Sequence, residues 1–174
     1  IELLLGTELN IMNARGEIDL PDSVLERLDI AIASIHMPCF KDERTIDNVT
    51  AAYEKVMEHP YVDIIGHPDD GRFPVDMKRL VKKAKETGTL LEVNNSSLRP
   101  EGFRENTKEN CLEMVKECKA QGVMIVLGSD SHVDADIAEY PYAEEILRET
   151  DFPEELVANV SLEKLKACIK HGKK

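Results

Sequence analysis

The chain has 174 residues, of which 42% are hydrophobic and 32% charged, and its formal net charge is -12 at pH 7. These values suit one globular domain and exclude a disordered chain. The negative charge argues against nucleic acid or an anionic membrane as the main partner. No segment resembles a signal peptide or a membrane span, and the four cysteines form no C-x-x-C pair, so we expect reduced thiols in a cytoplasmic protein.

Apolar runs alternate with amphipathic stretches along the whole chain. The first half predicts strands at about 1–9, 28–36 and 61–67, one helical turn at 23–27, and helices at 46–58 and 75–87. The second half predicts strands at about 89–94, 123–129 and 157–160, a polar loop at 95–106, and helices at 107–121, 140–149 and 162–170. Strands that alternate with helices predict an α/β fold with a parallel sheet.

A barrel is favoured over an open sheet because several candidate ligands each follow a strand, and barrel sites draw on many strand ends. An open sheet usually binds its ligand beside a glycine-rich loop, and no such motif is present. The chain starts with Ile1 inside strand-like sequence. We therefore expect residues 1–174 to be a single, incomplete barrel domain that lacks its first strand-helix unit. The exposed strand edges of such a barrel would favour a homo-oligomer.

Five side chains that commonly bind metals follow apolar runs: Glu8, His36, His67, Asp130 and His132. The carboxyl ends of parallel strands emerge at the same rim of a sheet, so these side chains are expected to converge. Imidazole and carboxylate groups together suit zinc, manganese or iron. Taken singly, each residue has a simpler interpretation. A histidine at the rim can serve only as a hydrogen-bonding group, and Asp130 can cap a turn.

Polar residues also follow the strand at 89–94. Glu92, Asn94, Asn95, Ser96 and Ser97 could bind substrate or orient a metal ligand. They could equally satisfy backbone groups in the turn that follows.

Three arginines and two further histidines complete the set of candidates. Arg72, Arg99 and Arg104 lie in loops that should border the rim, where one could clamp an anionic substrate, although solvation at the surface is the simpler interpretation. His59 and His171 are expected at the surface, near helix carboxyl termini.

Together these motifs resemble the PHP (polymerase and histidinol phosphatase) superfamily, and most of all its YcdX-like phosphatase branch. The resemblance rests on Glu8, Ser-Ile-His-Met-Pro at 34–38, Ile-Gly-His-Pro at 65–68, Leu-Glu-Val-Asn-Asn-Ser-Ser at 91–97 and Gly-Ser-Asp-Ser-His at 128–132. It implies a distorted (β/α)7 TIM-like barrel with up to three divalent metal ions. It also implies hydrolysis of a small phosphorylated substrate by a metal-activated water.

By the same resemblance, Glu8 bridges two metals, and His36 and His67 bind the second of them. Asp130 would bind the first metal and His132 the third. The family's H-x-H motif on the first strand has no counterpart here, so the chain alone is expected to be inactive or impaired. Two alternatives remain open: an amidohydrolase-like enzyme that cleaves C–N bonds, and a non-catalytic domain that retains bound metal.

Overall fold

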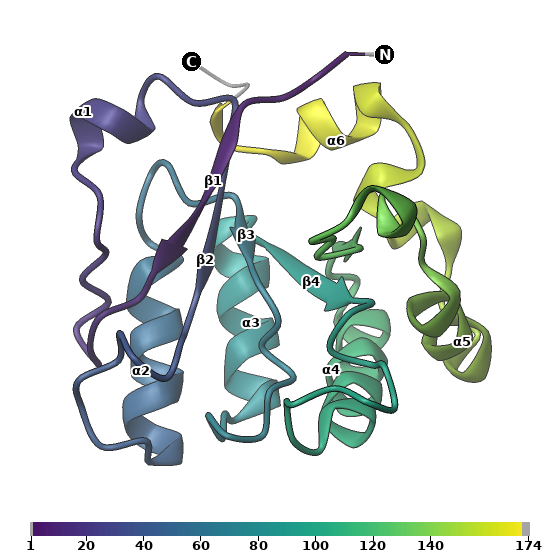
Figure 1. Cartoon of the computed structure of the whole chain (residues 1–174), viewed down its shortest axis with the longest axis horizontal. Coiled ribbons are helices and arrows are strands. Elements are labelled where there is room, and N and C mark those ends of the chain that lie inside the picture. Colours follow the sequence, from purple (N-terminus) through teal and green to yellow (C-terminus); the bar gives the residue numbers. More distant parts are fainter. Residues whose placement is uncertain (1, 172–174) are drawn as a thin grey trace.

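The structure, a computed structural model, describes residues 2–171. Its centre is an all-parallel sheet of five strands in the order β1-β2-β3-β4-β5 (Figure 1). The strands are β1 Gly6–Asn10, β2 Ile30–Ser34, β3 Ile64–Ile65, β4 Leu90–Asn94 and β5 Ile125–Gly128. In the described residues, β1 and β5 are the two edge strands. The predicted α/β fold with a parallel sheet is confirmed, and the arrangement is consistent with part of an α/β barrel.

Helices connect successive strands, and two more helices follow the last strand. They are α1 Asp22–Leu25, α2 Ile46–Val56, α3 Met77–Thr87, α4 Thr107–Gln121, α5 Pro141–Thr150 and α6 Leu162–Cys168. Three short 3-10 helices are η1 Asp134–Asp136, η2 Glu154–Leu156 and η3 Ala158–Val160. No helix within residues 2–171 combines the length and the apolar character that crossing a membrane requires.

Local sequence signals set the helix ends. The side chains of Thr45 and Asp76 accept hydrogen bonds from the first turns of α2 and α3, as good N-cap residues do. Helices α3 and α4 end at Gly88 and Gly122, whose φ angles of 68° and 69° are left-handed. The helix boundaries expected from periodicity are therefore close to those observed.

The sheet has a different environment on each face. Helices α2 to α5 pack on the outer face in the larger apolar core, which includes Leu9, Ala33, Ile65, Leu91 and Ile125 of the strands. On the inner face, a smaller cluster joins strand residues to η3 and α6, and its buried members are Ile64, Leu90, Val126, Ala158 and Ile169. Helix α6 thus closes the amino end of the sheet and leaves the carboxyl end for polar groups (Figure 1).

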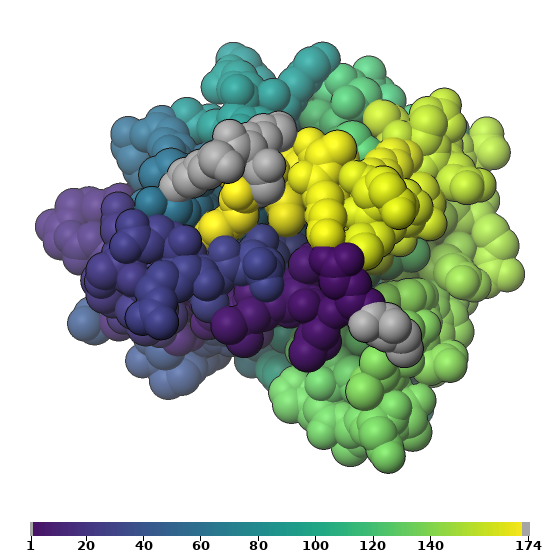
Figure 2. Space-filling view, turned by 90° about the horizontal axis from the view of Figure 1, so that it is seen from above, coloured from purple at the N-terminus to yellow at the C-terminus, as the bar shows by residue number. Residues whose placement is uncertain are grey.

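The N-terminal and C-terminal segments lie side by side at the end that α6 covers (Figure 2). An ion pair between Lys166 and Glu2 links them. All four cysteines are free thiols, as expected.

Two predicted strands differ from the structure. The first strand was expected at 1–9, but β1 begins at Gly6, and Leu3 and Leu5 are 89% and 64% exposed. Ile1 lies outside the described residues.

The predicted strand at 157–160 is wrong, because this segment is η3 and retains only an isolated bridge between Ile125 and Val157. The Asn159 side chain explains the difference. Its amide donates to the Leu127 carbonyl (2.9 Å) and accepts from the Leu127 N–H (3.0 Å), and so replaces the backbone of a pairing strand.

Candidate metal centre

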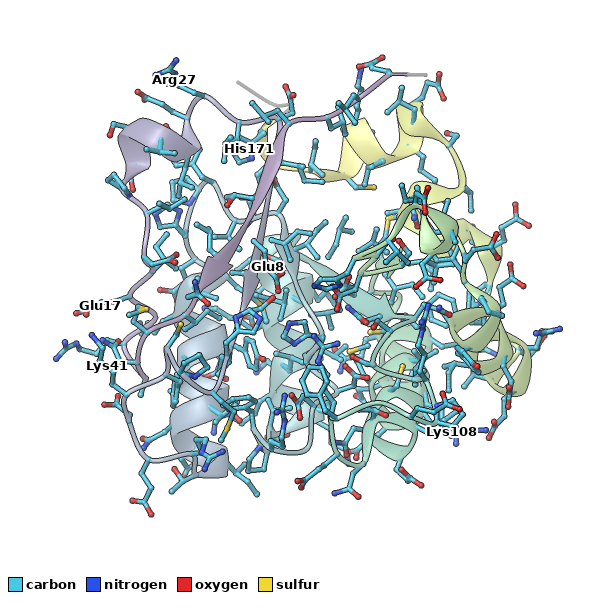
Figure 3. All side chains as sticks on the ribbon, viewed as in Figure 1. Glu8, Glu17, Arg27, Lys41, Lys108 and His171 are labelled. Atoms are coloured by element: carbon cyan, nitrogen blue, oxygen red, sulfur yellow. The ribbon has the colours of Figure 1, made fainter. Side chains whose placement is uncertain are left out.

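Three of the predicted ligands meet at the carboxyl end of the sheet: Glu8 of β1, His36 just after β2, and His67 just after β3. One ligand atom from each lies within 4.8 Å of the other two. The Nε2 atoms of His67 and His36 lie 3.0 Å and 3.4 Å from the same oxygen, Glu8 Oε1. Glu8 points from β1 toward the middle of the molecule (Figure 3). We call these three residues the candidate metal centre.

The parallel strands bring the three side chains together. Glu8 pairs in register with Ile32 of β2, and Ile32 pairs with Ile64 of β3, so the three strand ends are adjacent. The hydrogen-bonding contacts from His36 and His67 lower the pKa of Glu8 well below its ordinary value and outweigh the effect of burial. Glu8 is therefore a carboxylate at neutral pH.

A side-chain relay orients His36. The Asn10 amide nitrogen donates to Asp19 Oδ2 (2.6 Å), which leaves the Asn10 amide oxygen facing His36 Nδ1 at 2.8 Å. His36 must then donate through Nδ1, and in the neutral imidazole its lone pair lies on Nε2. That lone pair faces the Glu8 carboxylate, so a proton or a metal ion has to lie between them. Metal-binding histidines typically show this arrangement.

His67 lies deeper, only 3% exposed, and its backbone is unusual. Its φ angle of 32° is left-handed, and its N–H donates to Glu92 Oε2 at 2.7 Å. Burial raises the pKa of Glu92, and the nearby His67 partly offsets this effect.

Near the candidate metal centre, several buried polar atoms have no hydrogen-bond partner among residues 2–171. They include His67 Nδ1 and both carboxylate oxygens of Asp69. Burial raises the pKa of Asp69 to about 7, although Arg104 lowers it. Native structures rarely leave such atoms unpaired without a functional reason or a bound species.

The other two predicted ligands lie apart from this cluster. Asp130 Oδ2 accepts hydrogen bonds from Nη1 and Nη2 of Arg104 (both 3.2 Å) and from the Asn94 amide (3.2 Å). His132 is 86% exposed, and its Nδ1 lies 3.1 Å from the Asp130 carbonyl. Asp130 has a left-handed φ of 48°, which ends the alternation that would have aimed both side chains the same way. Their role as ligands stays a prediction.

The three residues predicted to contact substrate have different environments. Asn94 Oδ1 accepts from the Ser97 N–H (2.8 Å). The buried Asn95 accepts from the first backbone N–H groups of α5, at 2.9 and 3.1 Å, and so caps that helix. Ser96 lines a cavity of about 280 Å³ together with Arg99, Phe103 and Arg104, among others.

The arginines are paired rather than freely solvated. Arg72 binds Asp70 (2.5 Å) and Arg99 binds Asp136 (2.8 Å), while Arg104, with a side chain only 9% exposed, binds Asp130.

The surface position expected for His171 is wrong. Its side chain is buried, with Nδ1 at 2.6 Å from Asp63 Oδ2. His59 is partly exposed beside Asp22, at 3.2 Å. A signal for the His171 contact is present in the sequence, because Asp63 interrupts an apolar strand and a buried carboxylate requires a partner.

Comparison with known proteins gives a consistent family. The chain is 45% identical over 170 residues to a protein of Clostridium novyi named "Probable phosphatase", a match that covers 98% of this chain and 68% of that protein. It is 39% identical over 174 residues to a protein of the same description from Thermoanaerobacter pseudethanolicus, covering 100% and 70%. A third, from Acetivibrio thermocellus, is 41% identical over 173 residues, covering 99% and 70%. No family model matches the chain.

Proposed function

Because this chain belongs to the family of these probable phosphatases, we propose that it is a metal-dependent phosphoesterase of the PHP superfamily. Its substrate would be a small phosphomonoester. The observation that carries the proposal is the geometry at Glu8, where two imidazole Nε2 atoms face one carboxylate oxygen. The lone pair of His36 has no proton donor there unless the ring is charged.

The residues present fit a divalent metal ion. Two imidazole nitrogens and a carboxylate oxygen suit zinc, manganese or iron, and three protein ligands leave a position open for water or substrate. A metal bound there would lower the pKa of a coordinated water and polarise a phosphoryl oxygen.

The chain's own groups prepare the site. The low pKa of Glu8 keeps a negative charge available at neutral pH. Asn10 holds His36 in the orientation that leaves Nε2 free, and Glu92 holds the backbone of His67. By the family resemblance, Asp130 and His132 would serve further metals, which requires Asp130 to exchange Arg104 for a metal ion.

A second candidate is a domain that binds metal without turnover. The ion pair between Asp130 and Arg104 and the exposure of His132 favour it, because only three of the five predicted ligands converge.

Metal binding and phosphatase activity test the two candidates together. We expect the chain to bind zinc or manganese and to hydrolyse p-nitrophenyl phosphate slowly, since the resemblance implies impaired activity, in a metal-dependent way that a chelator abolishes. His67→Ala should lose both properties, whereas His59→Ala, which removes a histidine outside the cluster, should keep both. Full activity in His67→Ala would refute the proposal. Tight metal binding with no turnover would select the second candidate.

A further inference from the structure

Glu92 is a buried carboxylate that contacts the candidate metal centre without belonging to it. It lies on β4, the strand between β3 and β5, and is 7% exposed. Its side chain faces the inner side of the sheet, beside the strand ends that carry His67 and Asp130.

Gly128, at the end of β5, makes room for this carboxylate, and Gly66, just after β3, lies beside it. A Cβ added at Gly128 would overlap with Glu92 Oε1, and one added at Gly66 would lie 3.4 Å from Glu92 Oε2 and overlap with Ser34 Oγ. Neither glycine has a positive φ. These positions therefore require glycine because neighbouring side chains approach the backbone closely, and not because of the backbone conformation.

The contacts of Glu92 reach both neighbouring strand ends. Its Oε2 accepts from the His67 N–H at 2.7 Å and from the Asn94 amide at 3.1 Å. The same Asn94 nitrogen donates to Asp130 Oδ2 at 3.2 Å. A continuous set of hydrogen bonds thus runs from His67 through Glu92 and Asn94 to Asp130.

Both ends of this set have strained backbone. The φ angles of His67 (32°) and Asp130 (48°) are left-handed, a conformation that residues other than glycine adopt only when their surroundings enforce it. The hydrogen bond from the His67 N–H to a carboxylate is of the strong, charge-assisted type when Glu92 is ionised.

We infer that Glu92 is a positioning residue, which fixes His67 through its backbone and Asp130 through Asn94. It thereby sets the two sides of the site relative to one another. The inference rests on the metal site proposed above, because only there does the placement of His67 matter to function. A carboxylate that served the fold alone would affect stability without affecting metal affinity.

Three variants separate positioning from folding. Glu92→Leu removes the acceptor at similar volume, and Glu92→Gln keeps an oxygen acceptor in the same shape. Val93→Ala is the matched control, because Val93 is buried on the opposite face of the same strand. Each variant and the wild type are titrated with Co²⁺, and binding is measured from the visible absorption of the bound ion. Glu92→Leu should weaken binding by about 10- to 100-fold, the range for groups that orient metal ligands.

The other two variants separate cobalt affinity from thermal stability. Glu92→Gln should restore most of the cobalt affinity. Val93→Ala should lower the melting temperature and leave the cobalt affinity unchanged. Cobalt affinity that is equal in Glu92→Leu and the wild type would overturn the inference.

A second readout requires no metal. In ¹⁵N-resolved NMR spectra, loss of the carboxylate should move the His67 amide proton and the Asn94 side-chain amide upfield together, and Val93→Ala should move neither. If Glu92→Leu does not fold, Glu92→Gln gives the same shifts at smaller amplitude. If the wild type binds no cobalt, the proposed function fails. The NMR shifts then decide the inference alone, and an unmoved His67 resonance refutes it.

Discussion

The two ends of the parallel sheet each hold histidine against a carboxylate, but only the carboxyl end has an imidazole nitrogen without a partner among residues 2–171. At the amino end, Asp63 Oδ2 accepts from His171 Nδ1 (2.6 Å) and the Ala31 N–H (2.8 Å), and Asp63 Oδ1 accepts from the Lys170 N–H (2.6 Å). His171 Nε2 lies 3.0 Å from the Leu25 carbonyl. Both imidazole nitrogens of His171 therefore have a partner within the chain.

At the carboxyl end, two imidazoles share one Glu8 oxygen, and His67 Nδ1 has no partner within residues 2–171. His171 and Glu8 mark the two ends in Figure 3. Proximity of histidine and carboxylate is thus common to both ends. Unsatisfied polar atoms and strained backbone belong to the carboxyl end alone in this comparison. Those features, rather than proximity, indicate a binding site.

The largest effect is expected from a substitution that removes the Asp63–His171 contact at the amino end of the sheet. Asp63→Ala leaves His171 buried without its carboxylate partner and should lower the free energy of unfolding by about 3–5 kcal/mol, as for other broken buried pairs. Urea denaturation measures this. The control is Asp22→Ala, which removes the exposed Asp22–His59 pair and should cost at most about 1 kcal/mol. Equal effects in the two variants would remove the distinction between a structural and a surface pair.

The second prediction concerns the carboxyl end, where stability should depend on metal. Without metal, Glu8→Ala should change the free energy of unfolding by only about 1 kcal/mol, because Glu8 is partly exposed. Zinc at 100 times its dissociation constant should stabilise the wild type by about 2.7 kcal/mol and Glu8→Ala not at all. Thermal unfolding with and without zinc measures the difference. Equal stabilisation of both proteins would place the metal elsewhere.

The third prediction tests the relay that orients His36. Asn10→Ala removes the acceptor for His36 Nδ1 and should weaken zinc binding by about 10-fold or more. The matched control is Asn48→Ala, since Asn48 donates to the Glu43 carbonyl rather than to a histidine. Competition with a chromophoric chelator measures both affinities. An unchanged affinity in Asn10→Ala would show that His36 needs no orientation from this side.

The smallest effect is a difference in thiol reactivity. Burial raises the pKa of Cys118 to about 12 and that of Cys111 well above its ordinary value, so raising the pH from 7 to 9 should leave both unreactive. Cys39 follows His36 and Cys168 ends α6, and both are partly buried. His171 holds the segment after Cys168 against Asp63. His171→Ala should therefore speed chemical labelling of Cys168 but not of Cys39, as measured by mass spectrometry. Faster labelling of both would indicate general unfolding instead.

Much of the fold and part of the site could be predicted from sequence, because they depend on repeated local patterns. The alternation of apolar runs and amphipathic stretches indicates parallel strands with helical crossovers. Once the strands are parallel, the meeting of Glu8, His36 and His67 follows from their positions at strand ends.

The rest depends on single backbone angles and distant partners. The left-handed turn at Asp130 and its ion pair with Arg104, 26 residues earlier, leave no pattern in the sequence. His171 pairs with Asp63 across 108 residues, so only the isolated acid in an apolar strand indicates that a partner exists. The Asn159 side chain, which bonds to Leu127 in place of a strand, also leaves no signal in the periodicity, because periodicity reports only where apolar residues recur.

Glu92 and Gly128 are matched in size, and this has a consequence for how the family can vary. Alanine at Gly128 should be harmful while Glu92 keeps its length, yet harmless once residue 92 is shortened to serine. Deep mutational scanning should therefore find that the same substitution changes sign with its background. Aligned homologues should show positions 92 and 128 covarying rather than varying independently.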